Sequence, residues 1–143
     1  MHYLKQWTRL TKLERALLLR AFLTVAAARI ALWFVPFRSL RAFAARPRAS
    51  SAWQSLTPNR VAWAVQAAAR RIPAASCLTQ ALACQYLLGS VGQASRIHIG
   101  IAKDRNKSLK SHAWVEYRGQ IIIGDNGELE SYSPIAALGA KES

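Results

Sequence analysis

The sequence predicts an α+β domain in which helices come first and an antiparallel β-sheet follows. Three observations support this prediction. Apolar residues recur with helical spacing up to about Gly89, and they alternate with other residues from about Ser95 onward. The 143 residues are 52% hydrophobic and include five tryptophans, enough to build one core and to exclude global disorder. We expect one domain over residues 1–143, with a helical extension (1–50) and a core (51–143).

The first predicted helix begins at a capping box, in which Thr11 is the N-cap and Glu14 lies three residues later. Apolar residues then continue to Trp33 or Phe34, and Pro36 ends the helix. This helix is apolar around most of its circumference. We therefore expect it to be buried or covered by a partner.

A second helix is predicted after a basic connector. The segment Arg38–Ser51 is rich in arginine, contains a proline and is the one internal stretch that resembles a linker. Thr57 followed by Pro58 is typical of an N-cap and a first helical residue. We expect the helix to extend over residues 58–71, before the next proline.

The third predicted helix carries both cysteines of the chain. It begins at Cys77 and ends at about Leu88, with Ser76 as the N-cap and Gly89 as the C-terminal glycine. A cysteine nucleophile reacts as the thiolate, which the N–H groups and dipole at the first turn of a helix stabilise. Cys77 has that position. Cys84 lies about 10.5 Å further along the axis, too far for a disulfide, and we expect it to be a small core residue.

The remainder of the chain is expected to form an antiparallel meander. In SRIHIGIA (95–102) isoleucine occupies every second position, which is typical of a half-buried strand. Arg118 and Gly119 separate HAWVEY (112–117) from QIIIGD (120–125), a pattern that predicts a hairpin with a two-residue turn. A last short strand or turn is expected near Tyr132.

The net charge of +13 lies almost wholly in the N-terminal half of the chain. Residues 1–72 contain 13 Lys or Arg and a single acid, Glu14, whereas residues 73–143 are close to neutral. Such a half would attract an acidic protein, a nucleic acid or an anionic membrane surface, and the charge alone does not choose among them. Arginines on solvated helix faces are the plain alternative.

Residues 16–37 form an apolar run, but Arg20 and Arg29 leave no uncharged stretch of about 20 residues that could span a bilayer. No signal-peptide cleavage site follows. We expect a cytoplasmic protein with reduced cysteines, although this helix could lie on a membrane surface. The histidines and cysteines lack the spacing of a metal site, and there is no phosphate-binding loop, so we expect no cofactor.

The predicted hairpin tests whether a base can serve Cys77. If the turn contains two residues, Tyr117 faces Gln120 and His112 falls opposite Asp125. Opposed side chains have Cβ atoms about 4.5–5.5 Å apart, which suits a carboxylate that accepts a hydrogen bond from an imidazole. The pattern then predicts a triad of Cys77, His112 and Asp125. Because Arg-Gly is a weaker turn sequence than Asn-Gly, a bulge could shift this register by one residue.

Three further residues are candidates for the walls of this site. Gln80 lies one helical turn after Cys77 and could donate a hydrogen bond to an oxyanion or substrate. Trp114 shares the face of His112 if the strand is regular, and could contact substrate. His98, on the polar face of its strand, could be a second base, although a surface position is the simpler expectation. Packing or a solvated polar role is the plain alternative for each.

The chemistry-bearing motifs occur in three segments: ASCLTQALACQYLL (75–88), RIHIGIAKD (96–104) and SHAWVEYRGQIIIGD (111–125). Their combination resembles the transglutaminase-like leader peptidases of lasso-peptide biosynthesis, the separate protease component of the split B enzyme. The similarity extends over about residues 57–138, and the first predicted helix is similar to the family's opening helix. It implies a papain-related catalytic core over residues 51–143, with Cys77 as nucleophile, His112 as base and acid, and Asp125 as the orienting carboxylate.

The resemblance also implies a reaction and partners. The reaction is hydrolysis of the peptide bond that joins the leader to the core of a ribosomally synthesised precursor peptide. A separate ATP-dependent cyclase then closes the core, and a small companion protein recognises the leader. No nucleic acid is implied. Two alternatives stay open: acyl transfer to an amine, which the same triad performs in transglutaminases, and a non-catalytic basic binding module.

Overall fold

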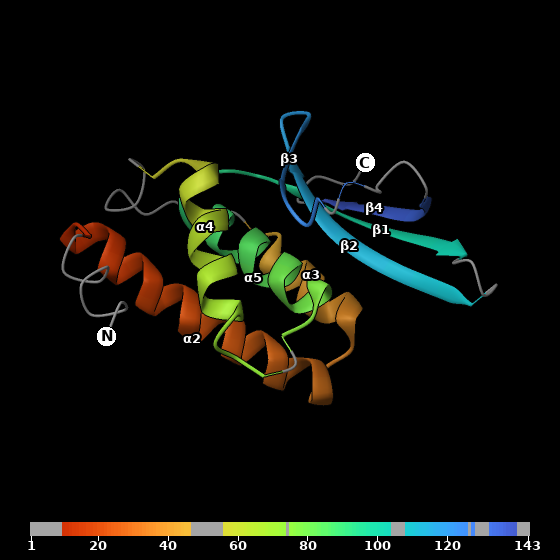
Figure 1. Ribbon diagram of the computed structural model, residues 1–143, viewed down its shortest axis with the longest axis horizontal. Helices are drawn as coiled ribbons and strands as arrows, with labels where there is room; N and C mark the ends of the chain where they lie inside the picture. The colour runs from red at the N-terminus through yellow and green to blue at the C-terminus, as the bar shows by residue number, and fades with distance from the viewer. Residues whose placement is uncertain are drawn as a thin grey trace.

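The helices precede the strands along the chain, as the sequence predicts. The structure, a computed structural model, describes residues 10–46, 56–73, 75–103, 108–125, 127 and 132–139. Its helices are α2 (Lys12–Phe34), α3 (Phe37–Ala44), α4 (Pro58–Ala69) and α5 (Cys77–Ser90). Its strands are β1 (Arg96–Lys103), β2 (Leu109–Tyr117), β3 (Gln120–Ile123) and β4 (Ser133–Gly139). The helices gather on one side of the antiparallel sheet (Figure 1), which confirms the α+β prediction.

The predicted starts of α2 and α4 are confirmed by their N-cap hydrogen bonds. Thr11 and Glu14 form both hydrogen bonds of a capping box at the start of α2. At the start of α4, the hydroxyl of Thr57 accepts from the N–H of Arg60. The carboxylate of Glu14 also pairs with the guanidinium of Arg60, so the single acid of α2 connects the two helix starts.

The segment Arg38–Ser51, expected to be a linker, is in part helical. Helix α3 occupies most of its described residues and buries Ala44, while the ring of Phe43 stacks on that of Tyr86 in α5 with centroids 5.8 Å apart. Contact with α5 therefore stabilises a helix that the basic, proline-containing sequence did not suggest. Residues 47–55, where the predicted boundary between extension and core falls, lie outside the described residues.

Helix α5 continues past its predicted end. Gly89 was expected to terminate the helix, but the helix extends to Ser90 and the first residue with positive φ is Gly92 (φ +78°). A Cβ atom at Gly89 would lie 3.0 Å from the carbonyl oxygen of Arg46. Gly89 thus allows the chain after α3 to approach α5 closely, a requirement that the local sequence does not reveal.

The sheet has the order β3-β2-β1-β4, and the predicted hairpin forms its β2-β3 edge. Tyr117 pairs with Gln120, and both turn residues, Arg118 (φ +49°) and Gly119 (φ +80°), have the positive φ of a two-residue hairpin turn. The strands β1, β2 and β3 form the predicted antiparallel meander. A strand near Tyr132 is confirmed as β4, but it does not continue the meander beside β3: it crosses to the other edge of the sheet and pairs with β1.

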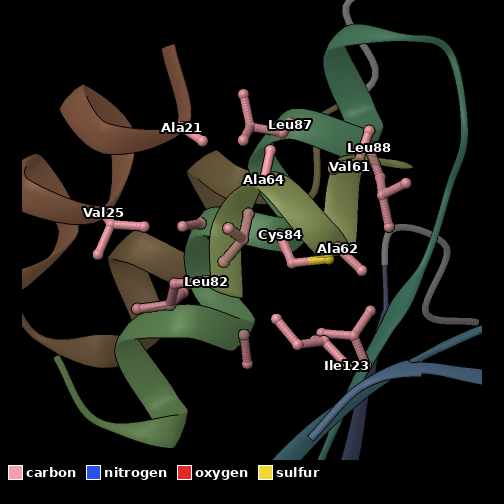
Figure 2. Packing of buried hydrophobic residues seen from close by; sticks show 14 of the residues in the cluster. Ala21, Val25, Val61, Ala62, Ala64, Leu82, Cys84, Leu87, Leu88 and Ile123 are labelled. Carbon is pink, nitrogen blue, oxygen red and sulfur yellow. The ribbon is translucent and has the colours of Figure 1, made fainter. Parts of the chain in front are cut away.

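The core lies between the helices and the face of the sheet that they cover (Figure 2). Leu87 and Leu88 of α5 are at most 1% exposed, and Val61 of α4 is fully buried. The strands contribute Ile97, Ala113, Val115 and Ile123 to the same cluster. Because α5 contacts β1, β2 and β3, its first residue is held beside the sheet.

Helix α2 buries only one face. Leu17, Ala21 and Val25 are buried, and α2 packs on α4 and α5 along this face. Large apolar side chains elsewhere on α2 are exposed, so the expected burial holds for one face only. By length and composition, α2 is the one helix among those described that could cross a membrane, a test that core helices of soluble proteins also pass.

Candidate active site

Cys77 is the first residue of α5, at the end of the helix that borders the sheet. The predicted N-cap is present: the hydroxyl of Ser76 accepts from the N–H of Thr79 at 3.2 Å. Helix geometry leaves the N–H groups of the first turn without partners inside the helix, and one N-cap side chain satisfies only one of them. The N–H groups of Cys77 and Leu78 are therefore available to a substrate carbonyl beside the thiol.

The second cysteine has a different environment. Cys84 is fully buried between α4 and α5, where Figure 2 shows its sulfur among the core side chains. Burial raises the pKa of the Cys84 thiol to about 12, because the interior stabilises the neutral form over the thiolate. Cys84 is thus a packing residue, whereas the half-buried Cys77 reaches a cavity.

A cavity of about 190 Å³ brings most of the predicted site residues together. It is lined by Gln66, Cys77, Gln80, His112, Ala113, Ile123, Gly124 and Asp125. These residues come from α4, the start of α5, β2 and the end of β3, so the cavity lies where the helices meet the β2-β3 edge. A larger cavity, of about 400 Å³, lies between α2, α3 and α5 and contains none of the predicted residues.

His112 is held by a backbone carbonyl. Its Nε2 atom forms a short hydrogen bond with the carbonyl oxygen of Gly124. A carbonyl oxygen can only accept, so Nε2 must carry the hydrogen and donate it. In a neutral imidazole this leaves the lone pair on Nδ1, and the tautomer is therefore fixed with Nδ1 as the basic nitrogen.

The predicted pairing of His112 with Asp125 is not found. The register shifts by one residue between Val115 and Glu116, and β3 already ends at Ile123. The side chain of Asp125 instead forms an Asx turn, in which Oδ1 accepts from the N–H of Gly127 at 2.9 Å. Asp125 is exposed and still lines the cavity. It lies in the bend after β3, however, and is not paired with His112 as a neighbouring residue in the sheet.

Gly124 makes this bend possible. Its φ is +93°, and a Cβ atom there would lie 2.7 Å from the carbonyl oxygen of Ala113 and 2.8 Å from Cα of Trp114. No other residue could bring the chain so close to β2 without displacing backbone. The bend carries the carbonyl of Gly124 to His112, so a residue that the sequence placed within the second strand of the hairpin determines how the imidazole is held.

Trp114 does not line the cavity, contrary to the expectation that it contacts substrate. Its side chain is 9% exposed and packs behind His112, with ring centroids 6.1 Å apart. Tyr132, just before β4, contacts both rings, with its centroid 5.6 Å from that of His112 and 6.1 Å from that of Trp114. Ala113 and Val115 of β2 belong to the main core beside α5, whereas Trp114 belongs to a separate buried cluster with Tyr132 and Ala102.

The rings of Trp114 and Tyr132 can pack here because residue 100 is a glycine. Gly100 pairs with His112 across β1 and β2, and a Cβ atom there would lie 2.6 Å from Cβ of Tyr132 and 3.1 Å from the ring of Trp114. His98, two residues earlier, stacks on Trp114, and its Nε2 lies 3.1 Å from a carboxylate oxygen of Glu116 without the alignment of a hydrogen bond. His98 is a partly buried supporting residue and does not reach the cavity.

Two glutamines line the cavity. Gln80 was expected, and its amide nitrogen makes only a long contact, 3.5 Å, with the carbonyl oxygen of Ala75. Gln66 was missed by the sequence analysis. The sequence feature that could have identified Gln66 is that it is the single polar residue between Arg60 and Arg70 on an otherwise apolar helix. Both amides could contact the backbone of a bound peptide.

Within the described residues, no group of three His, Cys, Asp or Glu side chains is close enough to hold a metal ion. The arrangement instead combines a thiol at a helix start, an imidazole of fixed tautomer and free N–H groups, which are the parts of nucleophilic acyl chemistry. A family model described as the transglutaminase-like superfamily matches residues 21–137 of this chain. Searches of curated proteins and of solved structures returned no match.

Proposed function

Because the chain belongs to the transglutaminase-like superfamily, whose members are usually cysteine-dependent enzymes, we propose that it is a cysteine peptidase with Cys77 as nucleophile and His112 as general base. One observation carries the proposal. Cys77, at the start of α5, shares a cavity with His112, whose Nε2 is engaged by Gly124 so that Nδ1 is the basic nitrogen. Cys84, the other thiol, is buried in the core.

In the proposed reaction, Nδ1 of His112 takes the thiol proton and the thiolate of Cys77 attacks the carbonyl carbon of the scissile peptide bond. The N–H groups at the start of α5, with Gln80 as a further donor, stabilise the oxyanion of the tetrahedral intermediate. The imidazolium then protonates the departing amine as the C–N bond breaks, which leaves a thioester. Water, deprotonated by His112, hydrolyses the thioester and restores the thiol.

We propose Asp125 as the third residue of the site, in a positioning role rather than as the direct partner of His112. The hydrogen bond that an orienting carboxylate would accept from His112 is made by the carbonyl of Gly124. The Asx turn of Asp125 with Gly127 supports the bend that presents this carbonyl. We therefore assign Asp125 a positioning role through the backbone, one residue after the acceptor itself.

The proposed substrate is the junction between leader and core in a lasso-peptide precursor. The support is the combination of motifs around Cys77, His98 and His112, together with an open cavity that exposes peptide-binding amides at Gln66 and Gln80. The proposed partners are a companion protein that recognises the leader and the ATP-dependent cyclase that consumes the freed core. We propose that the reaction takes place in the cytoplasm, where such precursors are made.

The test is cleavage of the precursor in the presence of the companion protein, followed by mass spectrometry. We expect free leader and free core from the wild-type protein, no product from Cys77→Ala, and undiminished product per folded molecule from the matched control Cys84→Ala. An adduct of the leader with an added amine, in place of the hydrolysed leader, would identify an acyltransferase. Unchanged cleavage by Cys77→Ala would disprove the proposed nucleophile.

A further inference from the structure

The outer face of α2 carries a continuous apolar stripe. Six large side chains that are 42–80% exposed make up this outward stripe: Leu19, Phe22, Leu23, Ile30, Trp33 and Phe34. Their spacing follows the turns of a helix, and two alanines, Ala26 and Ala27, fill the gap between the third and fourth. From its first to its last residue the stripe is about 22 Å long.

The outward stripe lies opposite the face that stabilises the fold. At about 100° per residue, the buried residues Leu17, Ala21 and Val25 project roughly half a turn of the helix away from it. Those residues hold α2 against α4 and α5. The outward stripe is therefore not needed to form the core. An exposed apolar surface of this kind typically marks a site that binds a partner or a membrane.

Basic residues border the stripe. Arg20 follows Leu19 by one position and Arg29 precedes Ile30 by one, so the two arginines lie on opposite edges. The guanidinium of Arg29 sits 4.4 Å from the ring centroid of Trp33. Lys12, exposed at the start of α2, lies on the same side as the stripe. The single acid of the helix, Glu14, is paired with Arg60 and does not offset these charges.

An apolar stripe with basic edges favours some binding partners over others. A second copy of the chain would bring together two surfaces edged with arginine on molecules that each carry +13, which opposes association. A bilayer-spanning position is excluded while α2 keeps its inner face on α4 and α5, because that face is then covered by protein. An amphipathic helix with an aromatic apolar face and basic edges is typical of binding within the surface of an anionic membrane.

We propose that α2 docks the folded protein on an anionic lipid surface, with the outward stripe inserted among the acyl chains near the headgroups and with Lys12, Arg20 and Arg29 at the level of the phosphates. The apolar cavity of about 400 Å³ beside the stripe extends this surface, since Leu23 and Ala27 line it together with the exposed Phe43 of α3. The active-site cavity shares no residue with this surface.

The test is flotation of the full chain with unilamellar vesicles of phosphatidylglycerol and, separately, of phosphatidylcholine. We expect binding to the anionic vesicles and little to the zwitterionic ones. The double variant Phe22→Gln/Trp33→Gln should bind about tenfold or more weakly, because two large side chains lose their burial in lipid. Lys12→Gln/Arg29→Gln should bind about fivefold more weakly for each charge removed, with a smaller dependence on salt.

The matched control is Ile121→Gln on β3, which removes an apolar side chain of similar exposure (40%) far from α2 in sequence. It should bind vesicles as the wild type does. Circular dichroism and cleavage of a soluble precursor should be unchanged in the stripe variants, which separates this proposal from the proposed function. The proposal would be overturned if the wild type did not bind phosphatidylglycerol vesicles at low salt, or if the Phe22/Trp33 variant bound them as tightly as the wild type. It would also be overturned if light scattering showed that the outward stripe instead forms a dimer or a complex with the companion protein.

Discussion

The Nε2 atom of His112 donates a hydrogen bond to the carbonyl oxygen of Gly124. This contact joins the middle of the sheet to the bend that follows β3, and it leaves Nδ1 as the basic nitrogen. A backbone carbonyl thus provides the orientation that a carboxylate provides in a Ser-His-Asp or Cys-His-Asp triad. The predictions for this site depend on the acceptor being the carbonyl of Gly124 and not a carboxylate.

Gly124→Ala should abolish cleavage and destabilise the fold by about 3 kcal/mol or more, because the new Cβ meets the backbone of β2 at a positive φ. Gly92→Ala is the matched control. Its φ is also positive, but no atom lies within 4 Å of the added Cβ, so only about 1 kcal/mol should be lost, with cleavage retained. Urea unfolding and precursor cleavage measure both effects; equal losses in the two variants would contradict the role of the bend.

Asp125→Asn should keep cleavage within about tenfold of wild type, because an amide oxygen can still accept from the N–H of Gly127. Asp125→Ala should lose more, along with about 1 kcal/mol of stability, because the Asx turn is gone. If the carboxylate itself oriented His112, Asp125→Asn would instead lower kcat by about 10⁴-fold, as removal of a triad carboxylate does. Steady-state kinetics of the two variants separates these roles.

Iodoacetamide should modify Cys77 in the native protein and leave Cys84 unmodified. Cys77 borders a cavity that is open to solvent, whereas Cys84 has no exposed surface and a pKa of about 12. Peptide mapping by mass spectrometry identifies the alkylated residue. Denaturant should make both cysteines reactive, and early labelling of Cys84 without denaturant would contradict the described packing of α5 on α4.

Cys84 should also make stability depend on alkaline pH. Its folded pKa, about 12, is raised above the unfolded value of 9.0, so its contribution is complete below about pH 9 and is lost as the pH rises towards 12. By about pH 10, the wild type should lose about 1 kcal/mol relative to Cys84→Ala. Urea unfolding at about pH 8 and about pH 10 measures this difference.

Local signals predicted several elements correctly. Thr11 with Glu14, Thr57 with Pro58, and Ser76 each begin a helix as expected, because an N-cap satisfies N–H groups only a few residues away. The Arg118-Gly119 turn follows from the same kind of local geometry. Features that involve distant contacts were missed: α3 packs on α5, where Phe43 stacks on Tyr86, and β4 pairs with the edge of β1 rather than beside β3.

The sequence by itself determined which residues are candidates for catalysis, because position in a helix separates Cys77 from Cys84 and strand alternation separates the faces of β2. The tertiary structure alone decided how His112 is held. A one-residue bulge in the β2-β3 ladder and the close approach at Gly124 replace the carboxylate of Asp125 with a backbone carbonyl. The bulge and the close approach both depend on how the chain leaves the sheet after β3. That path is set by strand pairing and by steric contact between segments distant in sequence, so no local sequence pattern predicts it.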